Sequence, residues 1–259
     1  MSFFRDLYYI NRKCVKDTLK LFGKNWLIIF IGIAYPVISI VLMKIIGILS
    51  MSFILSLFAG LILIIAESAI TSNFLYLLYN IVNHGKFTVQ DFKDGFKVYL
   101  WKIYTVFFIG WIARFVFDQF IARALQGILP FLSYIALALI IQILVLLLLN
   151  PLPEAIYQKH YSSWESIVYA FKFIKDNWIE WFIPNIIFML ILYYSTGTII
   201  SDVLAYNTGV FFNVSVFSIV RYLLGQLIFS FTMIYRGVLF DILSTSNRRK
   251  RMFMLDLYK

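Results

Sequence analysis

The chain alternates between short amphipathic segments that carry basic residues and long segments that are almost entirely apolar. A bilayer core about 30 Å thick is crossed by a helix of about 20 apolar residues. Six apolar segments reach that length, over residues 26–46, 52–80, 101–125, 131–150, 178–198 and 214–236. The pattern therefore predicts an all-α membrane protein, with one domain of six transmembrane helices over residues 1–259.

Three amphipathic segments each lead into an apolar one, over residues 3–24, 88–100 and 163–177. Each has an apolar stripe at helical spacing and lysines on another face, which is typical of a helix that lies on a membrane surface. Thr88 with Asp91, and Ser162 with Glu165, have the spacing of a capping box, which begins a helix. We therefore expect three surface helices, each followed by a hairpin of two spans.

The junctions between surface segment and span resemble one another. LKLFGKNW at 19–26 returns as FKFIKDNW at 171–178, and a degenerate copy, FKDGFKVYLW, lies at 92–101. Tryptophan favours the membrane–water boundary, where its ring is buried and its N–H stays wet. The tryptophans that end these junctions are therefore predicted interfacial anchors: Trp26, Trp101 and Trp178. The recurrence predicts three parallel repeats of one unit.

Composition and charge support a membrane protein and indicate its orientation. Hydrophobic residues make up 62% of the chain and charged residues 14%, whereas soluble domains are about 45–50% apolar. Most of the 23 Lys and Arg residues lie on one side of the predicted spans, and only Lys44 and Arg123 lie near the other. The positive-inside rule then places both termini and the three surface helices in the cytoplasm. The net charge of +10 fits anionic lipid headgroups as partner, not nucleic acid.

Four ionisable residues lie inside apolar segments: Glu67, Arg114, Asp118 and Arg221. Charges at membrane depth are costly and usually face the bundle interior or a wet cavity, so we take the four as candidate intramembrane binding residues. The alternative is that they only tie helices together. Arg114 and Asp118 are four residues apart, which suits a local pair. Glu67 lies near the middle of its span, and we predict that it pairs with Arg221 across the bundle.

No motif in the sequence carries recognisable catalytic chemistry. The chain has no phosphate-binding glycine loop, no nucleophile elbow and no Cys/His cluster with zinc spacing. We therefore expect no catalytic residue, no cofactor and no metal site, and we favour a non-enzymatic protein.

The six-span layout, the amphipathic leads ending in tryptophan and the pair Pro153-Glu154 after the fourth span resemble uncharacterised bacterial membrane proteins. These are similar to the membrane domain that precedes some glycerophosphodiester phosphodiesterases. The resemblance implies six helices in a bacterial plasma membrane. The phosphodiesterase domain itself is missing from this sequence, so its activity does not carry over.

These observations predict a multi-pass protein of the bacterial cytoplasmic membrane that serves as a transport or membrane-export component. Two alternatives remain open. An enzyme acting on lipids would place two or more carboxylates or a histidine at one depth on facing helices. A structural or partner-binding module would be packed solid, and a membrane-protein partner is open under this reading.

Overall fold

A computed structural model describes residues 2–49, 53–123, 131–208 and 215–246, and these residues form helices with no strand among them. The elements in chain order are α1 (Ser2–Lys24), α2 (Ile28–Leu49), α3 (Phe53–His84), α4 (Val89–Val98), α5 (Leu100–Val116), the π-helix η1 (Phe117–Ala122), α7 (Phe131–Leu148), α8 (Leu152–Gln158), α9 (Ser163–Thr196) and α10 (Val216–Thr245).

The described residues include six helical segments that are long and apolar enough to cross a membrane. They are Ile28–Ile48, Phe58–His84, Leu100–Ala122, Ile135–Gln158, Ser163–Thr196 and Val216–Thr245. This confirms the prediction of an all-α protein with six helices of membrane-spanning character.

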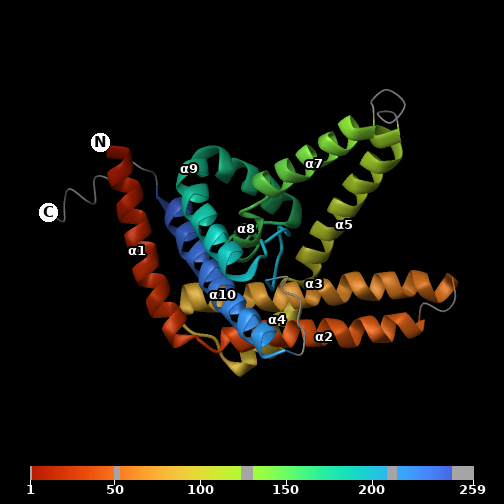
Figure 1. The fold of residues 1–259 in the computed structure, drawn as a ribbon, viewed down its shortest axis with the longest axis horizontal. Coiled ribbons are helices and arrows are strands. Elements are labelled where there is room, and N and C mark those ends of the chain that lie inside the picture. Colours follow the sequence, from red (N-terminus) through yellow and green to blue (C-terminus); the bar gives the residue numbers. More distant parts are fainter. Residues whose placement is uncertain (1, 50–52, 124–130, 209–214, 247–259) are drawn as a thin grey trace.

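The helices are arranged around α10 and the second half of α3 (Figure 1). The helices α2 and α3 lie side by side as an antiparallel hairpin that extends to one side of the molecule. The helices α5 and α7 extend away from the centre in another direction, and α1 runs beside α10 on the opposite flank. The short helix α8 lies in the middle, in contact with α3, α9 and α10.

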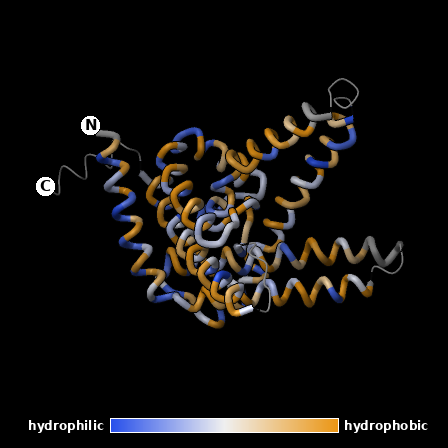
Figure 2. Tube along the Cα trace, in the orientation of Figure 1, coloured by the Kyte–Doolittle hydropathy of each residue, from blue (hydrophilic) through white to orange (hydrophobic). Residues whose placement is uncertain are grey.

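Burial is concentrated in two helices. In the apolar stretch of α3, 50% of the residues are buried, and in that of α10, 44% are buried. The corresponding shares are 11% for α5 and 11% for the α7 segment. The core between α3 and α10 is aromatic, since the rings of Phe74 and Phe229 stack with centroids 5.7 Å apart. The peripheral helices α2, α5 and α7 expose many large apolar side chains, and Figure 2 shows that their traces are largely hydrophobic.

Both predicted capping boxes are present. The Thr88 hydroxyl accepts from the Asp91 N–H while the Asp91 carboxylate accepts from the Thr88 N–H, and this begins α4. Ser162 and Glu165 make the same reciprocal bonds at the start of α9. Each box satisfies backbone donors that the first turn of a helix leaves unpaired.

Each of the two Asn-Trp junctions contains the same kind of hydrogen bond. In each, the asparagine side-chain amide donates to the carbonyl four residues earlier: Asn25 to Leu21 O at 2.8 Å, and Asn177 to Phe173 O at 3.2 Å. The expected surface helix 163–177 and span 178–198 form one helix, α9, but Asn177 is non-helical within it (φ −134°, ψ 22°). The shared asparagine therefore marks a bend in α9 and the turn between α1 and α2.

Candidate functional site

Glu67 lies on α3, about 20 Å along the helix axis from Asn80. Its Oε2 atom accepts a hydrogen bond of 2.6 Å from the hydroxyl of Tyr206, which belongs to the connection between α9 and α10. The hydroxyls of Tyr206 and Ser39 of α2 are 3.4 Å apart. Burial and the bond to Glu67 raise the pKa of Tyr206, so its hydroxyl stays a proton donor. The Tyr206 hydroxyl thus links the Glu67 carboxyl group of α3 to α2.

The predicted pair between Glu67 and Arg221 is not formed. The Arg221 guanidinium instead donates to the backbone carbonyl of Thr196, through Nε at 2.6 Å and also through Nη2. Thr196 is the last residue of α9, where carbonyls lack partners within the helix and a cation is favoured by the helix dipole. The pairing prediction was wrong because it weighed only the carboxylates as acceptors and left out the end of a neighbouring helix.

The Arg221 contact also explains the glycine that follows α9. Gly197 has φ +68°, a left-handed conformation that non-glycine residues rarely adopt. A Cβ atom at this position would lie 2.6 Å from Arg221 Nη2. Arg221 is therefore a residue that closes the end of α9 and does not reach Glu67.

Arg114 and Asp118 form the predicted local pair, with Nε and Oδ2 3.5 Å apart. Their side chains are 83% and 49% exposed, on the outer face of α5 and η1. The four intramembrane ionisable residues therefore do not converge on one site. Glu67 alone, among the four, lies within a network of groups from several helices.

A run of polar residues follows Glu67 on α3 and is buried. We call it the α3 polar segment; its members are Ser68, Thr71, Ser72 and Asn73. Asn73 accepts a 2.6 Å bond from the Tyr35 hydroxyl of α2 and donates to the carbonyl of Phe92 on α4. Ser72 donates to the carbonyl of Gly95 on α4 at 2.7 Å. The segment therefore fixes α4 to the centre of the bundle.

Contacts continue without a break from Glu67 to α4. The Tyr206 ring, which carries the donor to Glu67, packs edge-on against the Tyr35 ring with centroids 5.8 Å apart. Tyr35 in turn bonds to Asn73, which bonds to α4. A line of side chains thus connects the α9–α10 connection, through α2 and the middle of α3, with α4.

A second row of buried polar side chains lies on α10, at four-residue spacing: Tyr222, Gln226 and Ser230, which we call the α10 polar row. Tyr222 donates to the carbonyl of Gly32 on α2 at 2.9 Å and accepts from Gln226 at 3.0 Å. A Cβ at position 32 would lie 2.4 Å from Gln226 Oε1, so glycine permits this close approach.

Three side-chain atoms of these two groups are buried with no hydrogen-bond partner among the described residues: Thr71 Oγ1, Gln226 Oε1 and Ser230 Oγ. Buried polar groups are satisfied in the great majority of cases, because an unpaired one costs the full desolvation penalty. Three such atoms in adjoining helices mark hydrogen-bonding capacity in the core that the protein does not use internally.

Sequence reasoning missed a buried ion pair at the opposite end of the bundle. Arg236 of α10 donates to Glu154 of α8 through Nε at 2.8 Å and Nη2 at 3.1 Å, and both side chains are buried. Arg236 also donates to the Asn150 carbonyl, and its guanidinium lies 5.3 Å from the ring of Trp181. The sequence signal was the Pro153-Glu154 motif, but nothing in the sequence indicates that Arg236, near the end of the last span, lies beside it.

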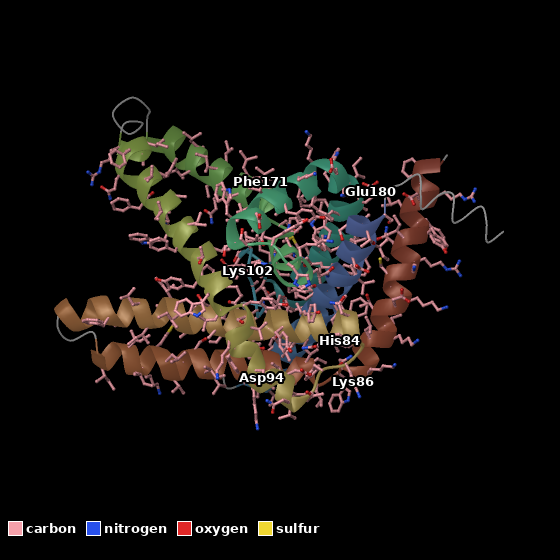
Figure 3. The ribbon with its side chains drawn as sticks, turned by 180° about the vertical axis from the view of Figure 1, so that it is seen from behind. His84, Lys86, Asp94, Lys102, Phe171 and Glu180 are labelled. Atoms are coloured by element: carbon pink, nitrogen blue, oxygen red, sulfur yellow. The ribbon has the colours of Figure 1, made fainter. Side chains whose placement is uncertain are left out.

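Lys102, at the start of α5, lies near the centre of the molecule (Figure 3). Its Nζ donates to the carbonyls of Ile156 and Lys159 at 2.8 and 3.3 Å, where the short helix α8 ends. The cation thereby satisfies carbonyls that the end of α8 leaves free.

The three predicted tryptophan anchors are all on the protein surface. Trp26, Trp101 and Trp178 are 52%, 69% and 59% exposed. Trp181, three residues after the last of them, is fully buried, and its indole N–H donates to Asn150 at 2.8 Å. Position relative to the junction therefore separates surface tryptophans from the one that packs in the core.

Over the described part of the chain, no group of three or more His, Cys, Asp and Glu side chains lies close enough to hold a metal ion. The Glu154 carboxylate, one of the groups that a lipid-acting enzyme could have used, is engaged by Arg236. Comparisons with protein-family models, with curated proteins and with solved structures yield no match for this chain.

Proposed function

We infer that the protein is a non-enzymatic transport or export component of the bacterial cytoplasmic membrane. We also infer that Glu67 binds protons or lies on a pathway along which protons move. The observation that carries this proposal is the environment of Glu67. Its carboxyl group lies within a predicted span, accepts from Tyr206 and belongs to neither of the two ion pairs recorded among the described residues. A carboxyl group at membrane depth without a cation is typical of proton and substrate pathways.

The polar groups beyond Glu67 support the same reading. The α3 polar segment and the α10 polar row offer unused hydrogen-bonding atoms at Thr71, Gln226 and Ser230. Such atoms can solvate a proton or a polar solute that a dry apolar bundle would exclude. A purely structural bundle gains nothing from them.

The proposal includes the orientation of the chain in the membrane. With both termini in the cytoplasm, α4 and the Asn-Trp junctions face inward, and the α9–α10 connection with Tyr206 faces outward. The outward-facing apolar side chains of α1, including Phe4 (75% exposed) and Leu19 (58% exposed), would then rest in the headgroup region beside its lysines.

The test is proton movement in proteoliposomes. The purified chain is reconstituted with a pH-sensitive dye inside, and a potassium diffusion potential drives protons inward. The wild-type protein should acidify the lumen faster than empty vesicles do, and Glu67→Gln should lose most of that flux because an amide cannot carry the proton. Asp118→Asn, which changes an exposed carboxylate on η1, is the matched control and should keep the flux. Equal flux in wild type and Glu67→Gln would refute the role of Glu67, and no wild-type flux above empty vesicles would refute proton passage.

A further inference from the structure

The connection between α9 and α10 is irregular, yet its apolar side chains enter the core. The helix α9 ends at Thr196, and the described part of the connection, residues 197–208, contains no helix. Ile200 and Leu204 are each 8% exposed and belong to the same hydrophobic cluster as the stacked rings of α3 and α10. The connection therefore packs into the bundle and does not simply pass across its end.

The connection reaches the depth of Glu67, since the Tyr206 hydroxyl donates to the Glu67 carboxyl group at 2.6 Å. Glu67 lies nine residues after Phe58, where the candidate span of α3 begins, and this is about 14 Å along the helix axis. That distance is close to half of a hydrocarbon core about 30 Å thick. The hairpin of α2 and α3 extends well beyond the connection (Figure 1), so the connection is re-entrant relative to that hairpin.

The backbone of the connection needs solvent. Over residues 198–206, no backbone group bonds to the backbone of another described residue, and only the Thr198 N–H has a side-chain partner among them, the Thr196 hydroxyl at 3.4 Å. Hydrocarbon does not tolerate unpaired N–H and C=O groups, and irregular backbone at membrane depth occurs only where protein buries it or water reaches it. Because the neighbouring helices leave these groups unpaired, water must reach the connection, and with it the side of Glu67 that faces Tyr206.

Aromatic rings close the opposite side of Glu67. Phe74, two turns further along α3, stacks on Phe229 with ring centroids 5.7 Å apart. It also meets the Tyr35 ring edge-on at 6.2 Å. All three side chains are at most 2% exposed. This packed layer from α2, α3 and α10 separates Glu67 from the C-terminal half of α3.

We propose that residues 197–208 form a hydrated plug, that water reaches Glu67 only from the side of this plug, and that Tyr206 closes that access. The Tyr206 hydroxyl bonds to Glu67 and lies 3.4 Å from the hydroxyl of Ser39. Its ring packs edge-on against the Tyr35 ring at 5.8 Å. One side chain thus bridges the plug, α2 and α3, and its release opens Glu67 to water. What then reaches Glu67 rests on the proposed function, whereas one-sided access to Glu67 does not.

The test is the reactivity of a reporter thiol in nanodiscs. Thr71→Cys in a Cys14→Ser chain places the only thiol one turn beyond Glu67, at a position that is 1% exposed. A permanently charged methanethiosulfonate should modify it slowly. Tyr206→Phe should raise the rate about tenfold, because opening then no longer breaks a hydrogen bond, and Tyr206→Ala should raise it further. Tyr194→Ala removes a tyrosine that is 82% exposed near the end of α9, and as the matched control it should change nothing.

The side of access is tested in intact cells, where every copy has one orientation. Thr71→Cys in a Tyr206→Ala chain should be labelled or protected together with Ser201→Cys, which lies on the plug. It should behave opposite to Lys97→Cys, which is exposed on α4.

Three results would each overturn the plug. They are a reporter thiol that reacts equally fast with and without the Tyr206 substitutions, an equal acceleration by Tyr194→Ala, and labelling that follows Lys97→Cys. Tyr206→Phe keeps the ring in place, so it separates loss of closure from loss of folding. A Glu67→Gln chain that retains proton flux would refute proton passage and leave these labelling results unchanged.

Discussion

The α3–α10 pair is less apolar but more buried than the α5–α7 pair. This relation between hydrophobicity and burial is the opposite of that expected for a soluble protein. The α7 segment has the most apolar window of the six spans, yet only 11% of that window is buried, whereas the less apolar windows of α3 and α10 are 50% and 44% buried. Lipid is as good a solvent for leucine as a protein core is, so apolar residues gain little by facing inward. Polar residues do gain, and they are concentrated on α3 and α10.

The two ion pairs differ in burial in the same way as the two pairs of helices. Glu154 and Arg236 are 0% and 7% exposed and share their site with Asn150 and Trp181. Asp118 of η1 and Arg114 of α5 are 49% and 83% exposed and lie one turn apart on consecutive helical segments. In this protein the polar content of a helix, and not its hydrophobicity, indicates that it lies in the centre.

The largest effect is expected from a substitution that breaks the buried ion pair. Arg236→Met leaves the Glu154 carboxylate buried without its cation and should lower the free energy of unfolding by about 3–5 kcal/mol. Arg114→Met, the matched control on the exposed pair, should cost no more than about 1 kcal/mol in dilute detergent, because solvent reaches the remaining Asp118. Unfolding by denaturant in detergent measures both, and equal losses would contradict the distinction between the two regions.

An intermediate effect is expected from one hydroxyl. Tyr35→Phe removes the donor to Asn73 Oδ1 in the buried network and should cost about 1–3 kcal/mol. Tyr104→Phe makes the same chemical change on α5, where the residue is only partly buried, and should be close to neutral. If both variants unfold alike, the α3 polar segment does not stabilise the packed region in the way described.

The effect that is smallest near neutral pH concerns Cys14, which is fully buried between α1 and the helices it contacts. Burial raises the pKa of its thiol to about 12. The unfolded chain ionises the thiol at lower pH than the folded one, so its contribution to stability falls as the pH rises from about 9 towards about 12. Wild type should therefore lose more stability than Cys14→Ala as the pH rises through that range, whereas ionisation of the thiol adds nothing to the difference between the two chains near neutral pH.

Reactivity gives an independent measurement of the same burial. A small maleimide at pH 8 should leave Cys14 unmodified in the folded protein, while Lys16→Cys in a Cys14→Ser chain, on the exposed basic face of α1, should react quickly. Rapid modification of Cys14 would show that α1 leaves α10 frequently and that this part of the packed region is open.

The sequence predicted features that depend on residues close together in the chain. The six spans follow from hydropathy, the starts of α4 and α9 from capping boxes, and the Arg114–Asp118 pair from four-residue spacing. These need no knowledge of which helices are neighbours.

Features that depend on helix neighbours could not be predicted. Arg221 binds the end of α9 and Arg236 binds Glu154 and the Asn150 carbonyl, because α10 lies against both places. Hydropathy identifies α10 as a span and says nothing of what surrounds it. For the same reason Glu67 was assigned a cation as partner, whereas it is Tyr206 of a distant connection that lies beside it.

The position of α10 has a consequence for the order of synthesis. The ribosome makes α10 after every other described helix, yet its two arginines complete the end of α9 and the charge of Glu154 on α8. Until α10 enters the membrane, a nascent chain holds an uncompensated carboxylate and uncovered carbonyls in a low-dielectric environment. The earlier helices therefore stay incompletely folded, and accessible to the insertion machinery and to membrane proteases, until the last helix inserts and completes their polar contacts.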